Sequence, residues 1–133
     1  MDLARRRGQH TQPAAPGDPV IAVIFELQPQ PGAQARYFDL AASLRPVLEA
    51  SDGFISVERF ESLARPGHFL SLSFWRDEEA VRNWRCTGTH RSAQQEGRSA
   101  VLAGYRLRVA AVMRDYGQLE REQAPADSLA ALF

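Results

Sequence analysis

The 133-residue sequence contains no lysine, one cysteine and only three histidines, and its sixteen basic residues are all arginine. Without lysine, the chain can form neither a Schiff base with a carbonyl substrate nor a lysine-containing phosphate loop. A single cysteine, Cys86, excludes an intrachain disulfide, and one cysteine with three scattered histidines cannot supply a four-ligand zinc site. The sixteen acidic residues balance the arginines, and zero net charge favours neither nucleic acid nor an anionic membrane as a partner. We therefore expect no bound metal.

Long apolar runs are absent as well. No segment approaches the ~18 uninterrupted apolar residues of a membrane span. Residues 1–19 combine Arg5–Arg7 with three prolines, which predicts a flexible leader. A twin-arginine export signal would need an apolar stretch after the arginines, but Gln9–Pro13 follows, and the first apolar run, Val20–Leu27, contains Glu26. We therefore expect a cytoplasmic protein with a reduced thiol.

The hydrophobic pattern predicts the order strand, helix, strand, strand, helix, strand. The predicted ranges are a strand over Val20–Leu27, a helix over Ala33–Ala50, strands over Phe54–Glu61 and His68–Trp75, a helix from Asp77 to near Gly88, a further helical stretch from Thr89 to about Leu102, and a strand over Tyr105–Met113. Asp77 is a good N-cap for its helix, while Pro46 removes one hydrogen bond from the first helix. This order is that of the α+β ferredoxin-like fold, β-α-β-β-α-β, with a four-stranded antiparallel sheet.

Residues 20–116 are expected to form this single domain, and residues 117–133 a C-terminal tail. The tail ends in the apolar stretch Ser128–Phe133, which would either be disordered or dock on a neighbouring subunit.

Both faces of the predicted hairpin carry large apolar side chains. Phe54 and Phe60 alternate with Ile55 and Val57 in its first strand. A sheet covered by helices on one side normally has a polar second face, and contiguous aromatic side chains there indicate a partner. We therefore expect a homodimer in which two sheets pack together.

Two stretches of the chain resemble the antibiotic biosynthesis monooxygenase family, whose members are dimeric α/β-barrel proteins. They are DGFISVERFESLARPGHFLSLSFW at 52–75, and FWRDEEAVRNW at 74–84 followed by HRSAQQEGR at 90–98. The resemblance covers about residues 20–116. It implies two ferredoxin-like subunits that form a β-barrel with the helices outside, and a pocket in each subunit between the sheet and the second helical region.

The resemblance also implies a reaction class. Several family members oxygenate a small aromatic, polyketide-like or quinol substrate without metal or flavin, because the electron-rich substrate itself reduces oxygen. Other members have no known activity. The resemblance therefore implies a monooxygenase that needs no cofactor, and the alternative is a non-enzymatic dimeric barrel that binds a small hydrophobic ligand.

Trp84 is the first candidate pocket residue. It lies on the predicted buried side of its helix and matches a pocket tryptophan of the haem-degrading branch of the family, although a large aromatic also fills cores. That branch places an axial histidine ten residues later, where this chain has Gln94, and an asparagine on the first strand, where this chain has Phe25. Glutamine is a poor iron ligand, so haem degradation is disfavoured. We expect Phe25, Phe74 and Gln94 to line the pocket with Trp84.

His90 is the candidate catalytic base. In a helix, His90 would share a stripe with Ala93, Gly97 and Val101, and this stripe would face the sheet. An imidazole that titrates near neutral pH can take a phenolic proton and leave an electron-rich anion for oxygen to attack. The alternative is a histidine at a helix start, bonded to a backbone group or to a carboxylate across the interface.

Two arginines alternate on the last strand. Arg106 and Arg108 should point to one face, and together with Arg59 they would either bind an anionic substrate or pair across the dimer with Glu58 or Glu61.

Overall fold

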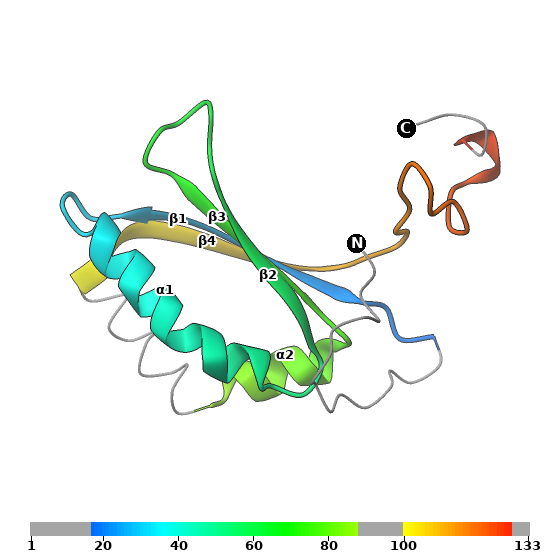
Figure 1. Ribbon diagram of the computed structural model, residues 1–133, viewed down its shortest axis with the longest axis horizontal. Helices are drawn as coiled ribbons and strands as arrows, with labels where there is room; N and C mark the ends of the chain where they lie inside the picture. Colours follow the sequence, from blue (N-terminus) through cyan, green and yellow to red (C-terminus); the bar gives the residue numbers. More distant parts are fainter. Residues whose placement is uncertain (1–16, 88–99, 129–133) are drawn as a thin grey trace.

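The computed structural model describes residues 17–87 and 100–128 (Figure 1). Four strands form one sheet in the order β2-β3-β1-β4, with every neighbouring pair antiparallel, and both helices lie on the same side of it. The elements are β1 Ile21–Pro29, α1 Gln34–Glu49, β2 Phe54–Glu61, β3 Phe69–Trp75, α2 Glu78–Arg85, β4 Leu102–Ala111 and a 3₁₀ turn at Ala126–Ser128. The expected α+β ferredoxin-like fold is confirmed.

The predicted elements differ from the observed ones mainly at their ends. β1 continues to Pro29, where its pairing with β4 shifts register. β4 begins at Leu102 rather than at Tyr105, and its first residues pair with the end of β1. The predicted helical stretch from Thr89 to about Leu102 ends close to its expected position, because residues 100–101 are helical and β4 follows them. The rest of this stretch lies in residues 88–99, outside the described residues. Ala103 and Gly104 carry no large apolar side chain, so the alternating pattern could not mark the start of this strand.

The sheet has two faces, because successive side chains of a strand point to opposite sides. We call the side toward the helices the inner face and the opposite side the outer face. On β1 the inner face carries Ile21, Val23, Phe25 and Leu27. The same register places Ala22, Ile24 and Glu26 on the outer face.

The inner face is tightly packed at its two ends. One cluster joins the start of β1 to α2, and the other joins the end of β1 to α1. The first contains Ile21, Phe54, Val57, Trp75, Ala80 and Val81, and the second contains Leu27, Tyr37, Phe69 and Val101. Phe54 and Trp75 meet edge to face at 5.4 Å between ring centroids. Full burial of such a side chain contributes about 1.5–3 kcal/mol, so these two ends hold the helices on the sheet.

β2 contains a β-bulge that reverses the side on which its later residues point. Phe54 pairs with Trp75, but Ser56 pairs with Phe74, so Ile55 is an extra residue on β2. Beyond the bulge Val57 and the residues in step with it face inward. The expectation that Phe54 and Phe60 share a face, opposite Val57, is therefore wrong, because strict alternation does not hold across a bulge.

Helix α2 begins at a defined N-cap, as the sequence predicted. The Asp77 carboxylate accepts a hydrogen bond from the Ala80 N–H at 2.9 Å and another from Arg76 Nε at 2.9 Å. Arg76 also pairs with Asp52 at 3.1 Å, which ties the start of α2 to the loop before β2. Burial alone would raise the pKa of Asp77, but these hydrogen bonds and the charge of Arg76 outweigh it, so the pKa lies below its ordinary value of 3.8.

Gly53 allows the loop before β2 to touch the first turn of α2. Its φ of +84° lies in the left-handed region, and a Cβ built on it would be 2.4 Å from Ala80 Cβ. The Gly53 carbonyl accepts a hydrogen bond from the Arg76 N–H at 2.7 Å. Only a residue without a side chain fits this contact.

The segment after β4 leaves the sheet and organises itself around Arg121 (Figure 1). The Arg121 guanidinium lies 5.3 Å from the centroid of the Tyr116 ring and donates hydrogen bonds to the carbonyls of Gly117 and Ser128. Residues 129–133 lie outside the described residues, so the predicted docking of the apolar end stays a prediction.

We predict that Gly53→Ala destabilises the fold more than Gly67→Ala does. Both glycines have a φ of +84°, but a Cβ at Gly67 would meet no atom within 4 Å. The positive φ should cost about 1–2 kcal/mol at each site, and the overlap with Ala80 should add about 1–3 kcal/mol at Gly53 alone. Urea unfolding measures the two differences, and equal losses would show that the contact with Ala80 does not constrain the fold.

We predict that the stability contributed by the Asp77 carboxylate disappears in acid. Because the pKa of Asp77 is lower in the folded protein than its ordinary value of 3.8, its charge stabilises the fold above that pH. The contribution is lost as pH falls from 3.8 through the folded pKa. The uncharged amide introduced by Asp77→Asn would still cap the helix, so the stability gap between the wild type and this variant should narrow over this range. Urea unfolding at a series of pH values measures the difference in unfolding free energy between the two proteins. A difference that stayed constant with pH would contradict the prediction.

Candidate functional site

The middle of the inner face is less tightly packed than its two ends. There, between the two buried clusters, Val23 and Phe25 of β1 and Ser71 and Ser73 of β3 are only half-buried. These two serines stand where larger side chains would fill the space under the helices, and Ser73 Oγ accepts a hydrogen bond from Trp75 Nε1 at 2.9 Å. Among the described residues, the middle of the inner face is therefore less filled by side chains than its two ends, and a ligand could bind there.

The side of this region along β4 is apolar and open. Tyr105, Leu107 and Val109 lie on the inner face opposite Leu27, Phe25 and Val23. They are 48%, 47% and 45% exposed, and within residues 17–87 and 100–128 the helices pack on β2 and β3 rather than on β4. A flat hydrophobic molecule could cover these side chains.

Two aromatic side chains flank the middle of the inner face. Phe25 packs against the second cluster and meets Tyr105 edge to face at 5.7 Å. Trp84 of α2 is half-buried against the first cluster, with its ring 6.2 Å from that of Trp75. Stacking on such rings favours a flat or cyclic ligand.

Tyr37 and Arg59 add polar groups to this interior. Tyr37 of α1 is 7% exposed, and Arg59 of β2 points toward it from the inner face. Burial raises the pKa of Tyr37, while a hydrogen bond from Arg59 and its charge act in the opposite direction without cancelling the effect. Tyr37 therefore stays protonated at neutral pH and keeps an O–H to donate.

Arg59 has a buried nitrogen without a partner. Its Nε is buried and has no hydrogen-bond acceptor among the described residues. Leaving a buried donor unsatisfied costs about 1–3 kcal/mol, and such groups in folded proteins usually have a functional explanation or an unseen partner.

The structure places two of the five predicted site residues on the same side of the sheet, against different clusters. Trp84 and Phe25 both lie on the helix side of the sheet. Phe74 pairs with Ala22 and Ser56 and therefore lies on the outer face, away from the other two. His90 and Gln94 lie outside the described residues, so their predicted roles stay predictions.

The three arginines that the sequence grouped are separated by the sheet. Arg106 and Arg108 lie on the outer face, in register with Glu26 and Ile24, whereas Arg59 lies on the inner face. Arg108 forms an ion pair with Glu26 at 2.9 Å. This ion pair lies within the chain, so the expected pairing across the dimer with Glu58 or Glu61 stays a prediction. A single anion site made by all three arginines is wrong, because the bulge turns Arg59 inward.

Tyr37 was not recognised as a site residue from the sequence, and Arg59 was expected to act together with Arg106 and Arg108 rather than with Tyr37. A buried phenol needs a hydrogen-bond partner, which could have prompted a search for one. No sequence signal marked the bulge that aims Arg59 toward it.

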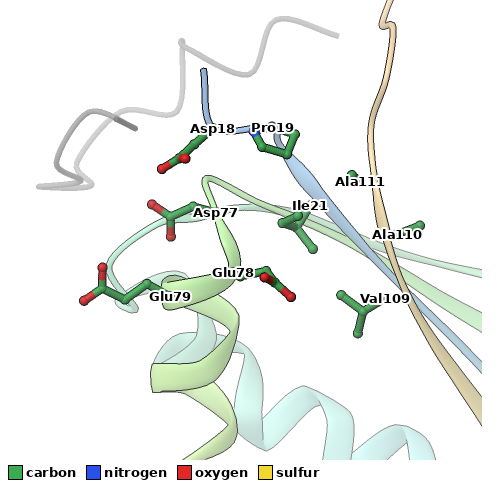
Figure 2. A pocket seen from close by; sticks show the side chains of 9 residues that line it. All are labelled: Asp18, Pro19, Ile21, Asp77, Glu78, Glu79, Val109, Ala110 and Ala111. Atoms are coloured by element: carbon green, nitrogen blue, oxygen red, sulfur yellow. The ribbon is translucent and has the colours of Figure 1, made fainter. Parts of the chain in front are cut away.

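A second opening lies at one end of the sheet, where β1 begins and β4 ends (Figure 2). Its volume is about 400 Å³, and its lining is Asp18, Pro19, Ile21, Asp77, Glu78, Glu79, Val109, Ala110 and Ala111. Figure 2 shows the Glu78 carboxylate directed toward β4, while those of Asp77 and Glu79 point away from it. Asp77 is already used by the N-cap and Arg76. Within residues 17–87 and 100–128, no group of three or more potential metal ligands is found.

Two further features of the described chain concern its helices and its single cysteine. No described helix has the length and apolar character needed to cross a membrane. Cys86 follows the last turn of α2 and is exposed.

The chain is similar in sequence to known proteins. A protein of the fungus Pyricularia oryzae, "Jasmonate monooxygenase ABM", is 54% identical over 93 residues, which are 70% of this chain and 43% of that protein. The chain thus spans less than half the length of this relative. The uncharacterized protein YqjZ of Bacillus subtilis is 29% identical over 99 residues, covering 74% of this chain and 84% of YqjZ.

Solved structures share the fold at low sequence identity. Rv0793 from Mycobacterium tuberculosis matches with a TM-score of 0.65 and 20% identity, covering 72% of this chain and 97% of that one. SO0527 from Shewanella oneidensis matches with a TM-score of 0.66 and 14% identity, covering 72% and 93%. The family model described as antibiotic biosynthesis monooxygenase matches residues 20–96. This chain therefore belongs to the antibiotic biosynthesis monooxygenase family.

Proposed function

We propose that this protein is a monooxygenase that binds a small cyclic substrate on the inner face, between the sheet and the helices. The observation that carries the proposal is the half-buried middle of that face, flanked by Phe25 and Trp84 and bordered by the open apolar side of β4. Family membership and the relative named as a monooxygenase support the reaction class.

The first candidate substrate is an electron-rich aromatic or quinol-like molecule, which needs no cofactor. His90 would remove a phenolic proton, and the resulting anion would transfer electrons to oxygen. At a ring CH₂, one oxygen atom becomes the new carbonyl oxygen and the other leaves as water with the two hydrogens, so the substrate supplies all the electrons. Phe25 and Trp84 would hold the ring while this occurs.

The second candidate substrate is jasmonate, which the name of the Pyricularia oryzae relative suggests. Jasmonate is a cyclic ketone that carries a carboxylate and is not electron-rich. Insertion of one oxygen atom into a C–H bond therefore needs two electrons and two protons from an added donor, with the second oxygen atom leaving as water. Oxygen uptake with and without a reduced nicotinamide or flavin distinguishes the two candidates.

A non-enzymatic ligand-binding barrel is the competing function. One observation favours it: the described polar side chains around the middle of the inner face supply hydrogen-bond donors but no base. These side chains are those of Tyr37, Arg59, Ser71 and Ser73. Catalysis of the first kind therefore depends on His90.

We predict that His90→Ala abolishes oxygen uptake with a panel of quinols and hydroxylated polycyclic aromatics. Loss of a general base lowers turnover by about 10²–10⁴-fold. His68→Ala is the matched control, because His68 lies in the turn before β3, where its described hydrogen bonds come from the backbone. Uptake that His90→Ala leaves intact would exclude this base, and no uptake by the wild type across the panel would favour the binding barrel.

We also propose that two copies pack through their outer faces. This face carries a contiguous apolar set, and no described helix covers it (Figure 1). Its apolar members are Ala22, Ile24, Phe60, Leu70, Leu72 and Phe74. Phe60 is 43% exposed in the isolated chain, and contiguous exposed apolar side chains on a sheet support an interface.

We predict that Leu72→Glu converts the dimer to a monomer. Leu72 lies in the centre of the outer face, beside Ile24 and Glu58. The carboxylate of the introduced glutamate would therefore be buried against the partner copy, close to the negative charge of Glu58. Leu63→Glu makes the same change at a fully exposed turn residue and should leave the dimer intact. Sedimentation equilibrium measures both, and a dimer that survives Leu72→Glu would place the interface elsewhere.

A further inference from the structure

The inner face holds a positive charge that no described acidic group balances. Arg59 forms no ion pair within residues 17–87 and 100–128, and its Nε is buried without an acceptor there. Glu61, the inward-facing carboxylate of the same strand, accepts a hydrogen bond from the Gly67 N–H at 3.0 Å and so belongs to the turn that follows β2. An arginine stays charged in any protein environment, so a bound anion would neutralise the charge of Arg59.

A second donor lies beside this charge. The Tyr37 hydroxyl lies near Arg59 and stays protonated, so it has a proton to donate. The two donors come from different elements, α1 and β2, and both point into the layer between the helices and the sheet. A guanidinium and a neutral phenol together can bind the two oxygens of a carboxylate.

The described neighbour of Arg59 on the adjacent strand is small. The cross-strand partner of Arg59 is Ser71, which is in turn the partner of Phe25 on β1. The path from Arg59 to the apolar middle of the inner face therefore crosses a serine rather than a large side chain. A ligand with its charge at Arg59 would place its hydrophobic body against Phe25.

We propose that Arg59 and Tyr37 form a binding site for the carboxylate of a small hydrophobic acid. One cation with one neutral donor matches a single negative charge better than the double charge of a phosphate monoester. The proposal rests on the proposed function in one respect, because the body of the acid would occupy the same inner face as the substrate.

The test measures how strongly the protein prefers an acid over its neutral counterpart. Benzoate is compared with benzamide, and jasmonate with methyl jasmonate, by calorimetric titration and by ligand-induced shifts in melting temperature. The wild type should bind each acid about tenfold or more tightly than its neutral counterpart, as expected for a charge-assisted hydrogen bond. Arg59→Gln should remove this preference and leave binding of the neutral compounds unchanged.

Two further variants keep the test decisive. Arg65→Gln makes the same change at an exposed turn residue and should retain the preference. Tyr37→Phe removes only a hydroxyl and should reduce the preference for the acid over its neutral counterpart several-fold. If Arg59→Gln does not fold, this variant tests the carboxylate site in its place. Equal binding of acid and neutral compound by the wild type would overturn the proposal. A preference for the acid that survives Arg59→Gln would also overturn it. If Arg59→Gln does not fold, a preference that survives Tyr37→Phe unchanged has the same consequence.

Oxygen uptake, measured in parallel, separates this inference from the proposed function. Preference for the acids without oxygen uptake retains the carboxylate site and rejects the monooxygenase. Oxygen uptake with neutral substrates, without any preference for the acids, retains the monooxygenase and rejects the carboxylate site.

Discussion

The bulge at the start of β2 determines which side chains the two faces of the sheet carry. One extra residue, Ile55, lies between two pairs that are otherwise in register with β3. Without it, Phe60 would point into the interior and Arg59 outward, because a shift of one residue exchanges the faces of a strand. With it, the charged side chain enters the layer under the helices and the aromatic one joins the outer apolar surface. Bulges commonly re-aim a side chain next to a functional site.

The parts of the fold that follow from local patterns could be predicted from the sequence. β2 was predicted with its observed bounds, and the Asp77 cap follows from a carboxylate placed before an acidic first turn. The early start of β4 could not be predicted, because its pairing partner lies about 70 residues away along the chain. The prediction that Phe74 lines the pocket was wrong for a related reason. Alternation shows that Phe74 and Trp75 face opposite sides, but only the packing of Trp75 against α2 shows which side is inside.

The buried Nε of Arg59 is compatible with a stable fold because the two ends of the inner face carry the packing. Phe54, Trp75 and Val101 are fully buried in the two end clusters. An unsatisfied donor costs about 1–3 kcal/mol, which is comparable with the contribution of one such side chain. The middle of the face can therefore hold polar groups and remain half-open while the ends keep the helices in place.

The two faces of one sheet can then serve two separate tasks with residues that are neighbours in the chain. Arg59 and Phe60 are consecutive, yet one faces the interior and the other the apolar surface through which we propose that copies associate. A binding site on the inner face therefore needs no residue from the outer face, and each copy of a dimer would hold a complete Tyr37–Arg59 pair. The outer-face and inner-face side chains project from opposite sides of the same strands, so a change at the interface reaches the ligand only by moving the backbone of β1, β2 or β3. The bulge is the point where such a movement would begin, since the ladder between β2 and β3 is interrupted there.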